Sequence, residues 1–192
     1  GANPMASNGS LMTVPDFRGR LKELHQRGGR MVVIDPRRSE TAAVADEHHF
    51  IKPGSDVLFL LALLNTLFAA TLTQPGRLAE FTDGLDAVRD AIAPFTPERV
   101  ATATGIAAAD IRRIARDFAA AKAAVCYGRM GVSTQAYGTL CQWAIQLINL
   151  VTGNLDRRGG ALFTLPAVDT VGTPETKPGH YAVWHTRVRK LP

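Results

Sequence analysis

Short apolar runs and longer stretches with helical spacing alternate along the chain. Residues 31–34 form an apolar, largely β-branched run that Asp35 and Pro36 end, which predicts a strand buried on both faces, as in a parallel sheet. Residues 49–51 are predicted as a second short strand, and residues 123–127 as another buried strand.

The stretches between the strands predict helices. One begins at residues 15–17 and runs towards the glycine pair 28–29, because proline favours a first helical turn and glycine the position past the end. Strands that alternate with helices indicate an α/β fold with a parallel sheet. Residues 1–14 are expected to form a loop, and further helices are predicted over 57–73, 77–92, from 96, over 106–122 and over 137–150.

The length of 192 residues suits one domain with its own core. We expect this domain to cover residues 1–165, and residues 166–192, which have no periodicity, to form a loop or tail. The chain has no initiator methionine and opens inside what resembles a functional loop, so we expect it to be a piece of a longer polypeptide. No export signal is visible, and no apolar run reaches the length of about 20 residues that a membrane span needs.

Charge adds little to this interpretation. The sequence has 22 Lys and Arg against 17 Asp and Glu, a net charge of +5, but the basic residues form no run. The excess is compatible with a phosphate-bearing ligand and gives no support for a nucleic-acid partner. Cys126 and Cys141 have no CxxC partner and the histidines lack metal-ligand spacing, so no metal site or catalytic residue is predicted.

Three loops are candidates for ligand binding, because ligands of open α/β sheets lie beyond the carboxyl ends of the strands. The first covers residues 1–7, where glycine permits close backbone approach and amides near a helix start attract phosphate; an ordinary turn is the alternative. The second begins at Asp35, which could accept from ribose hydroxyls, while Arg37 or Arg38 could balance a pyrophosphate. The alternative for this loop is a solvated turn.

The third loop covers residues 53–56 and ends in Asp56. A carboxylate accepts two hydrogen bonds side by side, which matches the two adjacent N–H groups of guanine and has no counterpart on adenine. Ser55 and Asp56 are also candidate N-caps of the apolar helix that follows, and both roles can hold together.

Taken in order, these segments resemble the molybdopterin oxidoreductases, the dimethyl sulfoxide reductase family. The resemblance covers about residues 1–165 and rests on these stretches: Gly1-Ala2-Asn3-Pro4; Val32-Val33-Ile34-Asp35-Pro36-Arg37; Pro53-Gly54-Ser55-Asp56; Gly128-Arg129-Met130-Gly131; and Leu150-Val151-Thr152-Gly153-Asn154 with Gly159-Gly160. It implies a Rossmann-like parallel sheet flanked by helices that lacks its first strand, because the family's strand before the Gly1 loop is absent.

The resemblance also implies the ligand, one guanosine end of bis(molybdopterin guanine dinucleotide) with molybdenum or tungsten. The residues it would place around that cofactor are Gly1, Ala2, Asn3, Pro4, Ser7, Asp35, Pro36, Arg37, Gly54, Ser55, Asp56, Met130, Gly131 and Thr134. Met130, Gly131 and Thr134 would approach the pterin; some relatives have glutamine where Thr134 stands, and here Gln135 is adjacent. The family's metal ligand and iron–sulfur cluster segment would belong to the parent chain.

The function implied is cofactor binding within an enzyme of two-electron redox chemistry, with formate, nitrate, a sulfoxide or a similar substrate. The remaining domains of that enzyme, and an electron-transfer subunit, would be its partners, and this piece alone is expected to be inactive. Two alternatives stay open. The acid after a strand also suits a nicotinamide-nucleotide dehydrogenase domain, although no GxGxxG turn is present, and a non-catalytic domain could derive from the same fold.

Overall fold

The computed structural model describes residues 1–9 and 14–162, and one compact unit covers Gly1–Ala161. The predicted tail over 166–192 lies outside the described residues. None of the helices in the described ranges combines the length and apolar character of a membrane span. The elements in chain order are α1 (Pro4–Ser7), α2 (Phe17–Gln26), β1 (Val32–Ile34), η1 (Ala42–Val44), β2 (Glu47–His49), α3 (Asp56–Ala69), η2 (Gly76–Phe81), α4 (Leu85–Ile92), α5 (Pro97–Thr104), α6 (Ala108–Ala120), α7 (Met130–Ser133) and α8 (Gly138–Val151).

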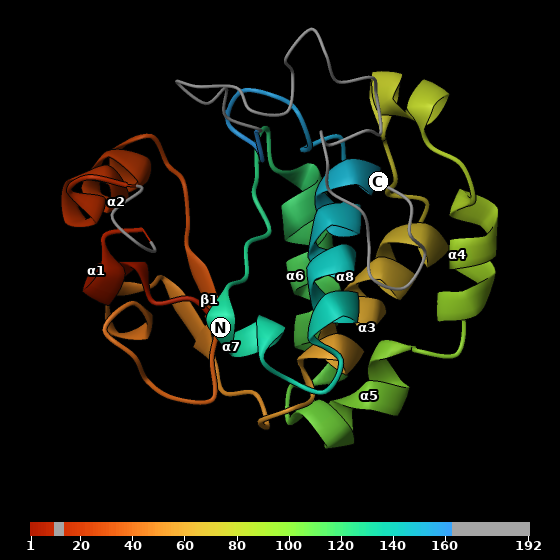
Figure 1. Cartoon of the computed structure of the whole chain (residues 1–192), viewed down its shortest axis with the longest axis horizontal. Coiled ribbons are helices and arrows are strands. Elements are labelled where there is room, and N and C mark those ends of the chain that lie inside the picture. Colours follow the sequence, from red (N-terminus) through yellow and green to blue (C-terminus); the bar gives the residue numbers. More distant parts are fainter. Residues whose placement is uncertain (10–13, 163–192) are drawn as a thin grey trace, which may run out of the picture. The chain divides into compact units, whose positions relative to one another are not determined.

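The core is built around α3. This helix is apolar nearly all round, and ten of its fourteen residues are buried, as predicted. It packs against α4, α5, α6 and α8, so that α3, α6 and α8 stand side by side in Figure 1. Ile111 and Ala115 of α6 are buried against it at helical spacing.

The sheet in the described residues consists of β1 and β2, which pair in parallel with Val33 opposite His48. The parallel pair with surrounding helices confirms a mixed, helix-rich α/β arrangement. Two details of the prediction are wrong. Val32 is 38% exposed, so β1 is not buried on both faces, and β2 begins at Glu47, two residues earlier than expected.

Residues 123–127 form no strand, contrary to the prediction. The segment is extended and runs between β1 and α8 in Figure 1, but Val125 and Tyr127 are each 54% exposed. Its hydrogen-bond partners are the side chains of Asn149, near the end of α8, and Asn154, just beyond that helix. The amide N–H of Cys126 donates to Asn149 Oδ1 at 2.8 Å, and Asn149 Nδ2 donates back to the carbonyl of Cys126 at 2.8 Å. A buried asparagine therefore takes the place of a neighbouring strand.

Three other predictions need correction. Residues 4–7 are helical rather than a loop. The helix predicted over 77–92 is broken into η2 and α4 by Gly84, whose φ of 81° leaves the helical region. Ser55 occupies the N-cap position of α3 but makes no capping hydrogen bond, because its hydroxyl donates to the carbonyl of Lys52 at 2.6 Å.

Candidate functional site

The chain's first residue lies at the meeting point of two segments that are far apart in sequence. The amino group of Gly1 is 3.5 Å from the carbonyl oxygen of Ile34 and 4.0 Å from Asp35 Oδ2. The carbonyl of Gly1 accepts from the amide of Gly131 at 3.0 Å. Figure 1 shows the N-terminus in this place, between β1 and α7. The first and fourth predicted segments thus meet directly at the carboxyl end of β1.

Contact this close requires glycine on both sides. A Cβ built on Gly131 would lie 2.6 Å from the Cα of Gly1, and one built on Gly1 would lie 2.8 Å from the amide nitrogen of Val132. From the sequence, glycine at these positions is expected to let a ligand approach the backbone. The structure shows that its first effect is the approach of two backbone segments to each other.

Asn3 links the first loop to the segment after β1. Its Oδ1 accepts from the amide and the hydroxyl of Thr41, at 3.2 and 2.7 Å, and its Nδ2 donates to Glu40 at 2.6 Å. The hydrogen bond from Asn3 lowers the pKa of Glu40. All polar atoms of the Asn3 side chain are therefore used within the protein. Ser7, by contrast, turns its hydroxyl back to the carbonyl of Asn3 at 3.1 Å.

Asp35 begins a tight turn at the end of β1. Its Oδ1 accepts from the amide of Arg37 at 2.8 Å, and its carbonyl lies 3.0 Å from His48 Nε2. Its side chain is only 14% exposed. Pro36 and Arg37 are exposed, and Arg37 pairs with Glu40 at 3.5 Å. Within the described residues Oδ2 of Asp35 accepts no hydrogen bond and faces the junction at Gly1.

Asp56 is a buried carboxylate at the start of α3. It is 7% exposed, while Gly54 before it is exposed with a φ of +83° and open space around it. The carboxylate accepts one hydrogen bond from the described side chains, from Gln135 Nε2 at 2.7 Å. Its charge, added to burial, raises the pKa of the Cys141 thiol on α8.

Gln135 is the residue of this site that the sequence analysis failed to select. Its Nε2 also donates to the carbonyl of Gly131 at 2.6 Å, so it joins the loop of Asp56 to the junction with Gly1. Thr134, the predicted contact, is exposed and donates its hydroxyl to the carbonyl of Met130 at 2.8 Å. The adjacent glutamine in the sequence was the available signal, but only the fold shows which of the two side chains turns inwards.

Hydrogen bonds connect Gly1, Gly131, Gln135 and Asp56. Asp35 reaches this set through its 4.0 Å contact with the amino group of Gly1, and Asn3 bonds to Glu40 and Thr41 in the segment after β1. The hydroxyls of Ser7, Ser55 and Thr134 bond to nearby carbonyls of their own segments, and the side chain of Met130 is 63% exposed.

Two arginines beside this set, Arg38 and Arg129, have no ion pair or side-chain hydrogen bond within residues 1–9 and 14–162. Arg38 follows the Asp35 turn and is exposed, and Arg129 is the half-buried N-cap residue of α7. Together with Arg37 they supply positive charge around the junction, and their guanidinium groups can donate charge-assisted hydrogen bonds to an anion.

A second cluster of titratable groups lies where β2 meets α6. Glu47, His49 and Asp110 place ligand atoms close enough together to hold a metal ion, which the sequence spacing did not suggest. Arg113 of α6 pairs with both carboxylates, however, and its hydrogen bond lowers the pKa of Glu47. A guanidinium already provides the positive charge there, so the cluster joins β2 to α6.

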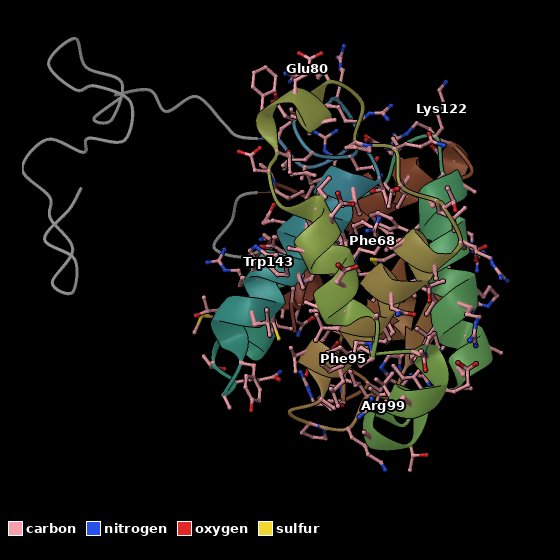
Figure 2. The ribbon with its side chains drawn as sticks, turned by 90° about the vertical axis from the view of Figure 1, so that its right-hand side faces the viewer. Phe68, Glu80, Phe95, Arg99, Lys122 and Trp143 are labelled. Carbon is pink, nitrogen blue, oxygen red and sulfur yellow. The ribbon has the colours of Figure 1, made fainter. Side chains whose placement is uncertain are left out.

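An apolar hollow of about 270 Å³ lies elsewhere, between α3 and the start of α5. Figure 2 labels two of the residues around it, Phe95 and Arg99. It contains none of the predicted site residues. Its lining consists of Leu58, Pro94, Phe95, Arg99 and Val100.

Comparison with known proteins gives the family. No protein-family model matches the chain. The chain is 31% identical over 165 residues to formate dehydrogenase H of Escherichia coli (strain K12). The matched stretch covers 82% of this chain and 23% of that protein. The chain is also 31% identical over 146 residues to the thiosulfate reductase molybdopterin-containing subunit PhsA of Salmonella typhimurium, over 73% of this chain and 19% of that protein. The chain belongs to the molybdopterin oxidoreductases.

As a molybdopterin oxidoreductase sequence, the chain spans about a quarter or less of the length of these relatives. The structure of acetylene hydratase from Pelobacter acetylenicus matches its fold with a TM-score of 0.68 at 24% identity, over 75% of this chain and 20% of that chain. Family membership and this fold agree with the order of the five resembling segments. They do not favour the nicotinamide-nucleotide dehydrogenase alternative.

Proposed function

We propose that this chain binds the guanosine diphosphate end of molybdopterin guanine dinucleotide within an oxidoreductase that carries molybdenum or tungsten. The observation that supports this most is the connected junction, in which Gly131 bonds to Gly1 on one side and, through Gln135, to Asp56 on the other. A dinucleotide that crosses this junction would meet an acidic group at each side and glycine backbone between them.

The chemistry of the donor and acceptor groups fits such a ligand. The buried carboxylate of Asp56 suits the paired N–H groups of guanine, and Asp35 suits ribose hydroxyls. Arg37, Arg38 and Arg129 suit the phosphates through charge-assisted hydrogen bonds.

The other predicted residues keep their roles as part of this proposal. Ala2, Pro4 and Ser7 would line the phosphate and nucleoside with the first loop, and Asn3 would hold that loop in place. Pro36 and Gly54 would shape the two acidic turns. Met130 and Thr134 would lie towards the pterin, and Ser55 would complete the nucleoside pocket.

We propose further that the sheet is Rossmann-like, with a place for one more parallel strand between β1 and residues 123–127. Gly1 is held between the ends of these two segments, by Ile34 on one side and Gly131 on the other. The backbone groups of Val125 and Tyr127 have no hydrogen-bond partner among the described residues, and both side chains are exposed. An extended segment leading into Gly1 would cover them.

The activity we propose is two-electron oxidation or reduction of a small substrate by the whole enzyme. When bound, the metal–dithiolene centre of the cofactor supplies that chemistry. This chain's residues bind and orient the nucleotide end. The remaining domains of the enzyme, an iron–sulfur cluster within them and an electron-transfer subunit are the partners that this function requires.

The test is the binding of guanosine diphosphate (GDP) and adenosine diphosphate (ADP) to the 192-residue chain, measured by isothermal titration calorimetry. We expect a preference for GDP, and in Asp56→Asn an affinity for GDP that is lower by about tenfold, because one charged acceptor is lost. Affinity for ADP should stay unchanged. Asp83→Asn, an exposed loop position, is the matched control. Equal affinity for GDP and ADP in the unaltered chain would overturn the proposal.

A further inference from the structure

Gln135 uses both protons of its amide to join two loops that are 79 residues apart in sequence. One goes to Asp56 Oδ2 at 2.7 Å and the other to the carbonyl of Gly131 at 2.6 Å. The side chain is half-buried, and it follows directly after α7 and Thr134. A shorter or purely apolar side chain at this position could not make both bonds.

The orientation of the Asp56 carboxylate depends on this one amide. Within the described residues no other side chain or backbone N–H donates to it, and Oδ1 accepts nothing. The groups that face it are the amide of Gln135, the buried thiol of Cys141 on α8 and the positive end of α3. A buried carboxylate with so few partners would otherwise rotate or draw in water.

We propose that Gln135 is the positioning residue for guanine recognition, an inference that rests on the function proposed above. A carboxylate oxygen accepts two hydrogen bonds, so Oδ2 keeps the bond from Gln135 and still offers a second lone pair. With Oδ2 held, Oδ1 and that lone pair face the two N–H groups of the base together. The bond to Gly131 couples this orientation to the junction where the phosphates bind.

This role separates Gln135 from its neighbour Thr134, whose hydroxyl is satisfied by its own helix. It also goes beyond structural support. A merely structural glutamine would stabilise α7 and leave discrimination between bases unaffected. If Gln135 is a positioning residue, replacing it lowers the affinity for GDP and leaves the affinity for ADP unchanged.

The experiment compares GDP and ADP binding at pH 7.5 and pH 5 in the 192-residue chain, Gln135→Ala and Gln135→Glu. Gln26→Glu, an exposed glutamine at the end of α2, is the control. We expect Gln135→Ala to bind GDP about tenfold more weakly with ADP unchanged, the effect of one lost hydrogen bond to a charged group. Gln135→Glu should be at least as weak at pH 7.5, because two carboxylates repel.

At pH 5 Gln135→Glu should regain most of its GDP affinity relative to the unaltered chain at the same pH. The introduced carboxyl, once protonated, again donates to Oδ2 of Asp56. Recovery with pH shows that the loss was not misfolding, even where Gln135→Ala fails to fold. If the unaltered chain prefers GDP and both variants keep that preference at pH 7.5, or if Gln135→Glu stays weak at pH 5, Gln135 does not position Asp56. If the unaltered chain shows no preference, the proposed function itself fails.

Discussion

At the scale of single residues, the site depends on two glycines, Gly1 and Gly131, neither of which has a Cβ. Gly1 and Gly131 lie so close that a single methyl group on either has no room. The sequence predicted a ligand contact at Gly1 because glycine permits close backbone approach, and at Gly131 only through the family resemblance. It assigned the approach to a ligand, since one sequence without coordinates does not reveal which other segment arrives at the same point.

Gly131→Ala should therefore destabilise the chain and weaken GDP binding together. The added Cβ would meet the Cα of Gly1 at 2.6 Å, and separating the two backbones should cost about 1–3 kcal/mol of the free energy of unfolding. Urea denaturation and calorimetry with GDP measure the two effects. Gly76→Ala is the comparison, because its φ of +59° costs backbone strain in open space, away from the site, and should leave GDP binding intact. An unchanged free energy of unfolding in Gly131→Ala would show that there is room for a methyl group between Gly131 and Gly1.

At the scale of elements, the sequence predicted best where a single pattern decides the structure. The apolar character of α3 and the Thr96-Pro97 start of α5 were enough to place those helices, and Thr96 does cap the amide of Arg99 at 3.3 Å. The prediction from sequence failed at residues 123–127, where an apolar run indicated a buried strand. Whether such a run joins a sheet depends on a neighbour that periodicity does not show.

The choice between Thr134 and Gln135 failed for a related reason. Both residues are polar, both follow α7, and the spacing of the resembling segments allowed either to face the ligand. The turn after Ser133 decides between them, by returning one side chain to its own helix and directing the other to Asp56. Such a turn depends on the packing of α7 against α8, which the local sequence pattern does not predict.

Asn149→Ala should show that the end of α8 holds residues 123–127 in their extended conformation. The substitution leaves the amide and carbonyl of Cys126 without partners in a buried place, which should cost about 2–4 kcal/mol of the free energy of unfolding, as two bonds are lost. Hydrogen exchange at the Cys126 amide should accelerate more than at amides within α3, which report only the global loss. Equal acceleration in both places would mean that Asn149 does not hold the extended segment.

The contact between β2 and α6 should depend on pH through Glu47. The Arg113 hydrogen bond holds the pKa of Glu47 below its usual 4.5, so this stabilisation is complete above pH 4.5 and is lost as pH falls through the lower folded value. Glu47→Gln should be less stable by about 2 kcal/mol at pH 7, and the difference should shrink below pH 4. Urea denaturation across pH 3–7 measures it; a difference independent of pH would contradict the ionic origin.

At the scale of the whole molecule, the described residues carry one group of candidate binding loops and several large apolar side chains that nothing among them covers. Val125, Tyr127, Met130, Tyr137 and Trp143 are large and more than two-fifths exposed, all between residues 123 and 143 (Figure 2 labels Trp143). The relatives are four to five times longer in sequence than the matched stretch. A cofactor that contacts several domains would find only part of its partners here.

The chain alone should consequently bind GDP weakly and catalyse nothing. With only one loop cluster in contact, we expect a Kd of about 1 mM, equivalent to about −4 kcal/mol. At 10 mM GDP the folded chain is then stabilised by about 1.4 kcal/mol, which should raise the thermal midpoint by about 3–6 °C. Differential scanning fluorimetry with equal concentrations of GDP and ADP measures this, and dye-linked assays with formate, nitrate or a sulfoxide should show no turnover. Because the ligand contacts would be shared with other domains, nanomolar affinity or robust turnover by the 192-residue chain would show that its loops form a complete site.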